Sequence, residues 1–205
     1  MTDRRTTILE AATRMIAQAG VRGLRVEQVA EQAGVSTALI YYHFGDRAGL
    51  LRQTLAFIYE RADRYTAPGP GATDAHTALE RVLLLELQDD EAVRENSTAW
   101  GELRSTAIFE TDLREQLLDA TRQWIDDITQ LVEKALADRA DAAGHADAAS
   151  RVDAAAIAER LTALVEGLSE RWLSGSIELD RARQMLREAI AVELAAAGIP
   201  DRRSR

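Results

Sequence analysis

Three positions between residues 30 and 40 restrict the fold of this chain more than any other feature of its sequence. Ala30, Gly34 and Ile40 lie at offsets of zero, four and ten. Two helices that cross closely need a small residue at the crossing, and a glycine suits the turn because its backbone accepts conformations that a side chain resists. The apolar third residue packs the second helix back against the first. The spacing therefore predicts a helix-turn-helix, a unit whose second helix lies in the major groove of DNA.

The helix expected after this turn has two different faces. Ser36 is a favourable N-cap, and Ile40 and Phe44 lie four residues apart, so both point inward. Hydroxyl and imidazole groups on the outer faces can donate to phosphates and base edges. Arg25 and Arg47 begin the preceding and following helices and suit phosphates. The predicted DNA-contacting residues are Arg25, Ser36, Thr37, Ala38, Leu39, Tyr41, Tyr42, His43 and Arg47.

Ordinary packing between helices is the alternative for the aromatic residues Tyr41 and Tyr42. A single tyrosine near a helix end is more often a packing residue than a contact to a partner. Here the three-position spacing, the N-cap serine and the flanking arginines agree with one another. Together they favour DNA contact by this helix.

Composition indicates an all-α fold. Ala, Leu, Glu, Arg and Gln dominate the 205 residues, and all five are strong helix formers. The three prolines stand at 68, 70 and 200, and no segment alternates apolar and polar residues as a half-buried strand does. The chain has no cysteine, which excludes a disulfide framework and a thiol nucleophile. With no apolar run of about 18 residues and no signal-peptide pattern, we expect a cytoplasmic protein without membrane contact.

Apolar residues at spacings of three and four predict the other helices. After a first helix that stops at Gly20, a second covers 26–33 and a fourth begins at Asp46. A buried helix is expected within 78–88 and one or two more within 92–109. Long helices are expected over 112–138 and 153–174, and a last one over 180–197 that stops at Gly198 and Pro200. Residues 66–76 are a linker, residues 138–151 a polar connection, and residues 201–205 a frayed tail.

Charge is spread unevenly along the chain. Residues 1–55 hold seven arginines and five acidic residues, which gives them a net charge of +2. Because the whole chain has a net charge of −9, the remaining residues have a net charge of −11. A mildly basic N-terminal part thus precedes an acidic body, which agrees with DNA contact at one end only.

The stretch "ILEAATRMIAQAGVRGLRVEQVAEQAGVSTALIYYHFGDRAGLLRQTL" resembles the N-terminal domain of the TetR family of transcription regulators. The resemblance covers about residues 5–55. It implies an all-helical homodimer with a helix-turn-helix DNA-binding domain, residues 1–48, and a helical effector-binding and dimerisation domain, residues 49–205. One departure concerns the second helix, which the family commonly opens with Thr or Ser. This chain has Arg25 and Val26 there, so the Arg25 guanidinium would take over the phosphate contact.

The segment "NSTAWGELRSTAIFETDLREQLLDATRQW" resembles the C-terminal domain of the choline-responsive Bet repressors. Family resemblance and broad apolar faces both point to the two long helices as a twofold interface. An intramolecular core is the alternative for the same faces. The predicted interface residues are Ile128, Leu131, Leu161, Leu164, Leu168 and Trp172.

A ligand pocket is expected among the helices around 78–110 and the inner face of the long helix 112–138. The candidate wall residues are Glu86, Trp100, Leu103, Phe109 and Trp124, and Glu102 lies on the same helices. Aromatic rings near carboxylates suit a cationic ligand. A mostly apolar pocket for a hydrophobic ligand fits the sequence at least as well.

These features predict a ligand-responsive regulator of transcription. The simplest form is a repressor that binds double-stranded DNA at a palindromic operator as a homodimer and is released by a small-molecule effector. No cofactor or metal is expected, because His43, His76 and His145 lie far apart and the chain has no glycine-rich phosphate loop. An enzyme and a helical interaction protein that does not bind DNA are the alternatives. The sequence does not identify the effector, the operator or the target genes.

Overall fold

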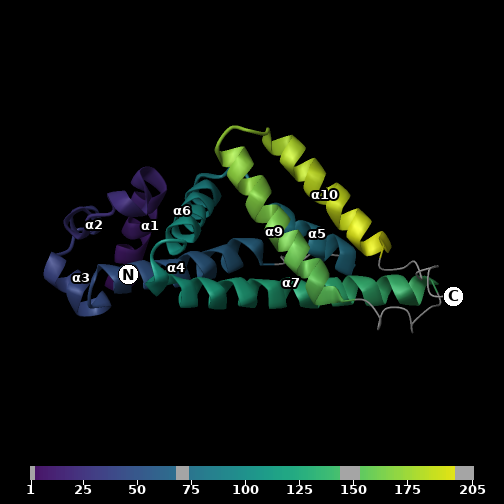
Figure 1. The fold of residues 1–205 in the computed structure, drawn as a ribbon, viewed down its shortest axis with the longest axis horizontal. Coiled ribbons are helices and arrows are strands. Elements are labelled where there is room, and N and C mark those ends of the chain that lie inside the picture. The colour runs from purple at the N-terminus through teal and green to yellow at the C-terminus, as the bar shows by residue number, and fades with distance from the viewer. Residues whose placement is uncertain (1–2, 68–73, 144–152, 197–205) are drawn as a thin grey trace. The chain divides into compact units, whose positions relative to one another are not determined.

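The computed structural model describes residues 3–67, 74–143 and 153–196 of the chain. Its contacts divide the chain into two compact units. The N-terminal unit comprises the residues up to Tyr65 together with Asp89–Thr121, and the C-terminal unit comprises Thr66–Gln88 and the residues from Arg122 onward. Figure 1 shows the elements of each unit in chain order.

The N-terminal unit contains α-helices of 8 to 20 residues and the first turns of a longer one. The elements are α1 (Arg4–Gly23), α2 (Val26–Ala33), α3 (Thr37–Phe44), α4 (Arg47–Thr66), α6 (Glu91–Ala107), the 3-10 helix η1 (Thr111–Leu113) and the first turns of α7 (Arg114–Ala143). Helix α1 packs against both α2 and α6. The helix-turn-helix is therefore anchored by α6, a helix that lies far from it in sequence.

One apolar core holds this unit together. Ile8 and Ile16 of α1, Leu55 of α4 and Leu103 of α6 are almost completely buried in it, and burying such a side chain contributes about 1.5–3 kcal/mol. Polar contacts fix how α4 and α6 pack. Arg61 Nη1 lies 2.6 Å from Glu95 Oε1, and Asn96 Nδ2 donates to the Ile58 carbonyl at 3.1 Å.

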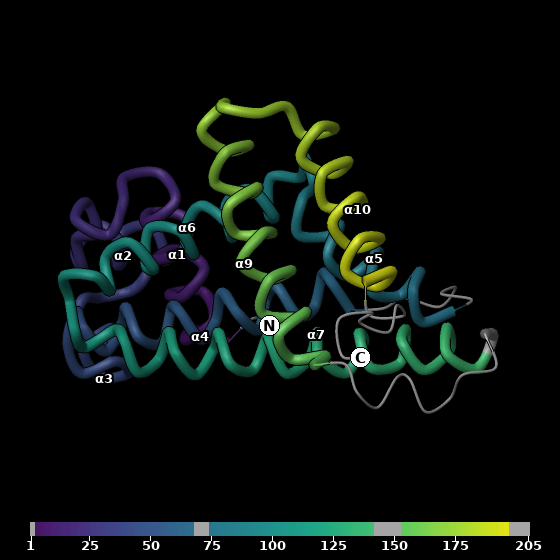
Figure 2. The backbone as a smooth tube through the Cα atoms, turned by 45° about the vertical axis from the view of Figure 1, so that its right-hand side comes forward, coloured from purple at the N-terminus to yellow at the C-terminus, as the bar shows by residue number. Residues whose placement is uncertain are grey.

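The C-terminal unit contains α5 (Ala75–Leu85), the remaining turns of α7, α9 (Ala154–Leu173) and α10 (Leu179–Ala196). Helices α9 and α10 run antiparallel and pack against each other (Figure 2). The turn between them uses Gly175 at φ 73°, and the Ser176 N–H donates to the Arg171 carbonyl at 2.7 Å. Arg160 on α9 and Glu193 on α10 form a two-bond ion pair, with distances of 2.7 Å and 2.5 Å.

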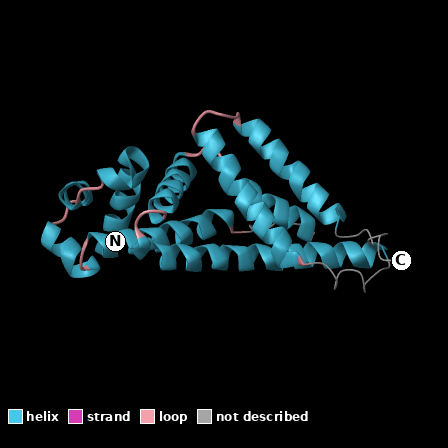
Figure 3. Ribbon diagram, viewed as in Figure 1, coloured by secondary structure: helices cyan, strands magenta, loops and turns pink. Residues whose placement is uncertain are grey.

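The predicted all-α class is confirmed. Within the described ranges, helices and their connecting turns account for the whole structure, and strands are absent (Figure 3). Among the same residues, no helix combines the length and the apolar character that crossing a membrane would require.

The helix stop predicted at Gly20 agrees with the backbone, because Gly20 is not helical, with φ 70° and ψ 168°, and a kink there separates the main part of α1 from its last residues up to Gly23. One helix end differs from the predicted one. Helix α7 continues past residue 138 to Ala143, because the intervening Arg and Ala residues are good helix formers even without an apolar face. Residues 68–73, 144–152 and 197–205 lie outside the described residues. They include most of the predicted linker, the end of the polar connection, the helix stop at Gly198 and Pro200, and the tail.

The compact units do not follow the predicted division at residue 48. Helices α4 and α6 pack with α1–α3 in the N-terminal unit, whereas the predicted boundary places most of α4 and all of α6 in the second domain. A compact unit and a functional domain are different things, so the boundary between residues 48 and 49 stays a prediction.

Candidate nucleic-acid interface

The turn between α2 and α3 has the geometry that its sequence spacing requires. Gly34 adopts the left-handed conformation, with φ 65° and ψ 38°, and its N–H donates to the Glu31 carbonyl at 3.1 Å. The Val35 N–H donates to the Ala30 carbonyl at 2.9 Å. Ala30 and Ile40 are buried. The three positions at offsets of zero, four and ten thus have the small, turning and packing roles expected of a helix-turn-helix.

Helix α3 buries one side and exposes the other. Ile40 and Phe44 are packed into the core, while 82% of Tyr42 and 45% of Tyr41 remain exposed to solvent. The Tyr42 and His43 rings meet edge to face, with centroids 5.3 Å apart. A tyrosine as exposed as Tyr42 gains almost nothing from packing, so its position favours contact with a partner over an intramolecular role.

The other predicted contact residues of α3 occupy the rim of the same face. Ser36 caps the helix, because its Oγ accepts a hydrogen bond from the Leu39 N–H at 3.2 Å. Ser36 and Ala38 are exposed, and Thr37, Leu39 and His43 are half-buried. The structure thus brings the predicted residues from 36 to 43 together on one short helix.

Arg25 stands at the N-cap of α2 and is exposed. Its side chain makes no capping hydrogen bond, so it does not replace the capping role that Thr or Ser would have there. The first backbone N–H groups of a helix have no partner within the helix and lie at the positive end of its dipole, so the start of a helix favours an anion. Arg25 adds a positive guanidinium at the start of α2, which suits a phosphate there.

Arg47 has a role that the sequence did not reveal. Its Nη2 donates to the Val21 carbonyl at 2.7 Å and its Nε to the Leu24 carbonyl at 3.5 Å. The side chain is half-buried and ties the start of α4 to the end of α1 and to Leu24, which follows it. No local pattern signals this contact, because its partners lie 23 and 26 residues away in the chain.

The predicted ligand-binding residues are divided between the two units. In the N-terminal unit, Leu103 is buried in the core, Trp100 is half-buried with the Arg104 guanidinium 5.6 Å from its ring centre, and Phe109 is 77% exposed. In the C-terminal unit, Glu86 follows α5 and Trp124 packs against the core of that unit, both half-buried. Which of these residues contact an effector stays a prediction.

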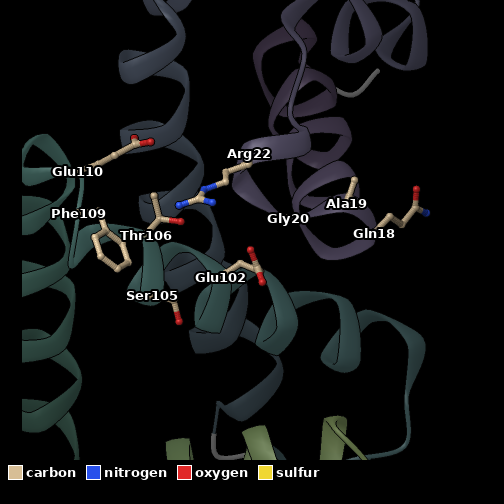
Figure 4. A pocket seen from close by; sticks show the side chains of 9 residues that line it. All are labelled: Gln18, Ala19, Gly20, Arg22, Glu102, Ser105, Thr106, Phe109 and Glu110. Atoms are coloured by element: carbon tan, nitrogen blue, oxygen red, sulfur yellow. The ribbon is translucent and has the colours of Figure 1, made fainter.

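A surface hollow of about 550 Å³ lies between the end of α1 and the end of α6. Figure 4 shows its walls, with Glu102, Phe109 and Glu110 on one side and the turn around Gly20 and Arg22 on the other. Most of the residues that line it are exposed. Of the predicted wall residues, Phe109 lines this hollow, and so does Glu102, the further carboxylate that the sequence placed on the same helices.

The predicted dimer residues are largely covered within one chain. Ile128, Leu161, Leu168 and Trp172 are buried in the core of the C-terminal unit, as the intramolecular alternative expects. Leu131 and Leu164 are half-buried and keep apolar surface for a partner. The twofold interface stays a prediction.

No cluster of three or more His, Asp or Glu side chains suited to a metal ion occurs in the part of the chain that the structure describes. His145 and Asp147 lie outside that part.

Helix α3 is capped, presents an exposed aromatic and polar face, and follows a left-handed glycine turn in an all-helical structure. These features define the class of helix-turn-helix DNA-binding proteins.

Family models narrow this class. Residues 8–54 match the bacterial regulatory proteins of the tetR family, and residues 75–195 match the C-terminal region of BetI-type transcriptional repressors. The chain belongs to the TetR family of transcription regulators, with a C-terminal region of the BetI type.

Individual proteins agree with this assignment. A proposed TetR-family regulator from Rhodococcus sp., known from its crystal structure, is 45% identical to this chain in sequence. The two structures match with a TM-score of 0.83 over 95% of this chain and 100% of that one. A proposed transcriptional regulator from Saccharomonospora viridis, solved in complex with choline, is 27% identical over 91% of this chain and 95% of that one, with a TM-score of 0.72. The regulator BetI of Burkholderia thailandensis is 29% identical over 85% of this chain and 82% of its own length.

The predicted functional class is confirmed. The chain is a ligand-responsive, DNA-binding regulator of transcription and not an enzyme.

Proposed function

We propose that this protein is a repressor that binds a palindromic operator as a homodimer and is released when a small-molecule effector binds. The observation that carries the proposal is the outer face of α3, where Tyr41 and Tyr42 are exposed while Ile40 and Phe44 are buried. The match of residues 75–195 to BetI-type repressors supports repression over activation. Blocking a promoter also needs no contact beyond DNA binding itself.

Each side chain of the interface suits a particular contact. The Tyr42 hydroxyl and the His43 imidazole suit donation to phosphates, and Thr37 and Ala38 near the start of α3 suit contact with base edges and methyl groups. Arg25 adds a phosphate contact at the start of α2. Arg47 donates from its guanidinium to the backbone before α2, so its main role is to support the interface. It can contact DNA only through an N–H group that these backbone bonds do not use.

A homodimer is required because one short recognition helix reads only one half-site. Two copies related by a twofold axis present two α3 helices to successive major grooves, about 34–36 Å apart. Leu131 on α7 and Leu164 on α9 retain partly exposed apolar surface in the C-terminal unit. They are the predicted interface residues best placed to contact a second copy.

The proposed effector is a small organic cation. One relative of similar fold was solved with choline, and the chain carries a net charge of −9 that is concentrated outside residues 1–55. Aromatic rings attract such a cation through their negative faces. Trp124 is the favoured ring, because the face of Trp100 already meets the Arg104 guanidinium.

The test is a selection from random duplex DNA with the full chain, followed by titration with choline. We expect an enriched palindrome whose half-site centres lie about one helical turn apart. Choline should weaken operator binding, whereas a neutral analogue of the same size should not. A selection that enriches no sequence would overturn the repressor proposal, and unchanged operator binding at saturating choline would overturn the cationic effector.

A further inference from the structure

A carboxylate on α6 holds the bend in α1. Glu102 Oε2 accepts a hydrogen bond from the Val21 N–H at 3.3 Å, across 81 residues of sequence. Gly20, one residue earlier, has φ 70°, a conformation that disfavours any side chain. A Cβ at Gly20 would also lie 2.8 Å from Glu102 Oε2. Figure 4 shows the Glu102 side chain directed toward this turn.

The same short segment is held on its other side by Arg47. The Arg47 guanidinium donates to the Val21 carbonyl at 2.7 Å, so the N–H and the carbonyl of Val21 each meet a charged side chain of suitable sign. At 2.7 Å the bond from Arg47 has the length of a charge-assisted hydrogen bond, whereas the bond to Glu102 is longer. We call this arrangement of Gly20, Val21, Glu102 and Arg47 the α1 latch.

The latch lies at the junction between two functional parts of the chain. The segment after Gly20 leads directly into α2, which carries α3, and all three lie within the match to the tetR-family model, residues 8–54. Glu102 lies on α6, within the match to the BetI-type model, residues 75–195. A small shift of α6 would therefore change the Glu102–Val21 hydrogen bond and with it the position of the segment that leads into α2 and α3.

We propose that Glu102 is a positioning residue for DNA binding, which fixes the orientation of α2 and α3 through Val21. The inference rests on the proposed function, because it supposes an operator that α3 recognises. Glu102 does not contact DNA in this scheme.

The direct test compares Glu102→Ala with Glu110→Ala in the full-length dimer, on the operator obtained by selection. Both variants remove one carboxylate from the same hollow, and loss of an acidic group near DNA by itself strengthens binding. We expect Glu110→Ala to bind as tightly as the unaltered protein or slightly more tightly. Glu102→Ala should bind about fivefold more weakly, the effect of losing one hydrogen bond. Glu102→Gln should restore most of the affinity, because its amide oxygen still accepts.

A double-mutant cycle with Gly20→Ala tests the close approach itself. Gly20→Ala alone should weaken operator binding, since the added Cβ displaces Glu102. In the double variant with Glu102→Ala that clash is gone, so the combined loss should be smaller than the sum of the single losses. Additive losses would show that Gly20 and Glu102 act independently and would overturn the latch.

Two readouts separate positioning from a general effect on stability. Hydrogen exchange of the Val21 amide should be faster in Glu102→Ala, with exchange in the core of α1 unchanged. A lower melting temperature with unaltered operator affinity would overturn the proposal, as would an unaltered Val21 exchange rate. If the unaltered protein enriches no duplex, the proposed function fails and this inference with it. If it binds and the Glu102 and Glu110 variants bind alike, only the inference fails.

Discussion

Tyr42 shows how a single residue on α3 can serve binding without serving stability. With 82% of its surface exposed, the side chain contributes little to the core, yet its hydroxyl stands on the face proposed for DNA. We expect Tyr42→Ala to lower operator affinity about tenfold, or about 1.4 kcal/mol, without changing the melting temperature. Fluorescence anisotropy at fixed salt measures the affinity.

Phe109→Ala is the matched control for Tyr42→Ala, because it also removes an exposed ring from the N-terminal unit but not from α3. It should bind the operator normally. Equal affinity of the Tyr42 and Phe109 variants would remove Tyr42 from the interface.

Ser36 allows capping and DNA contact to be separated. Its Oγ accepts from the Leu39 N–H at 3.2 Å, and loss of such an N-cap costs about 0.5–2 kcal/mol. Ser36→Ala should therefore lower the free energy of unfolding. Ser36→Asp keeps a capping oxygen and should keep the stability, but its negative charge would face the phosphates and reduce operator affinity. Thermal unfolding and anisotropy together give both quantities, and an Asp variant that binds as tightly as Ser36 would place this position away from the phosphates.

Sequence reasoning about single residues succeeded where the cause was local. Ile40 and Phe44 are buried together because they lie four residues apart on one helix, and Gly34 is left-handed because the turn demands it. It missed the partners of Arg47 and Glu102, because a side chain that bonds the backbone of a distant segment leaves no periodic signal.

At the scale of elements, the α9–α10 hairpin contains an ion pair whose strength depends on pH. Hydrogen bonds from Arg160 lower the pKa of Glu193 below its ordinary value of 4.5, although partial burial opposes them. A carboxyl whose folded-state pKa is lowered stabilises the fold above its unfolded-state pKa, and this contribution is lost as the pH falls through the lowered value. The pair thus contributes at neutral pH and not in strong acid.

We expect Glu193→Gln to lower the free energy of unfolding at pH 7 by about 0.2–1 kcal/mol, the range for exposed pairs. The difference between the variant and the unaltered protein should shrink as the pH falls below 4.5. Glu133→Gln, at an exposed position of α7, controls for the change in net charge. Melting temperatures across a pH series provide the measurement. A difference that persists unchanged in acid would mean that packing, not the ion pair, links the two helices.

Helix positions followed well from apolar periodicity. Gly20 interrupts α1 where the sequence predicted a stop, and Glu102 accepts a hydrogen bond from the Val21 N–H that follows. Helix α7 continues to Ala143 because good helix formers need no apolar face to extend an existing helix.

At the scale of the whole molecule, the proposed recognition of a palindromic operator requires two copies of the chain. Leu131 and Leu164 are half-buried within one chain, so glutamate at both positions should cost little in the isolated fold but prevent association. We expect the double variant Leu131→Glu/Leu164→Glu to sediment as a monomer and to lose binding to the palindrome, with helical content retained. Leu118→Glu, at an exposed leucine of α7, should remain dimeric. A double variant that stays dimeric would place the interface elsewhere.

The sequence by itself determined the helical class and the helix-turn-helix, because these depend on spacings of three, four and ten residues and on turn chemistry within one short segment. The resemblance of residues 5–55 to the TetR family added the family. Only the tertiary structure decided which residues support that segment. It placed Glu102 on Val21, turned Arg47 inward and buried most of the residues predicted for the dimer. Such pairings form when helices distant in the chain pack together, and the choice of partner depends on the shape of the whole unit rather than on any local pattern.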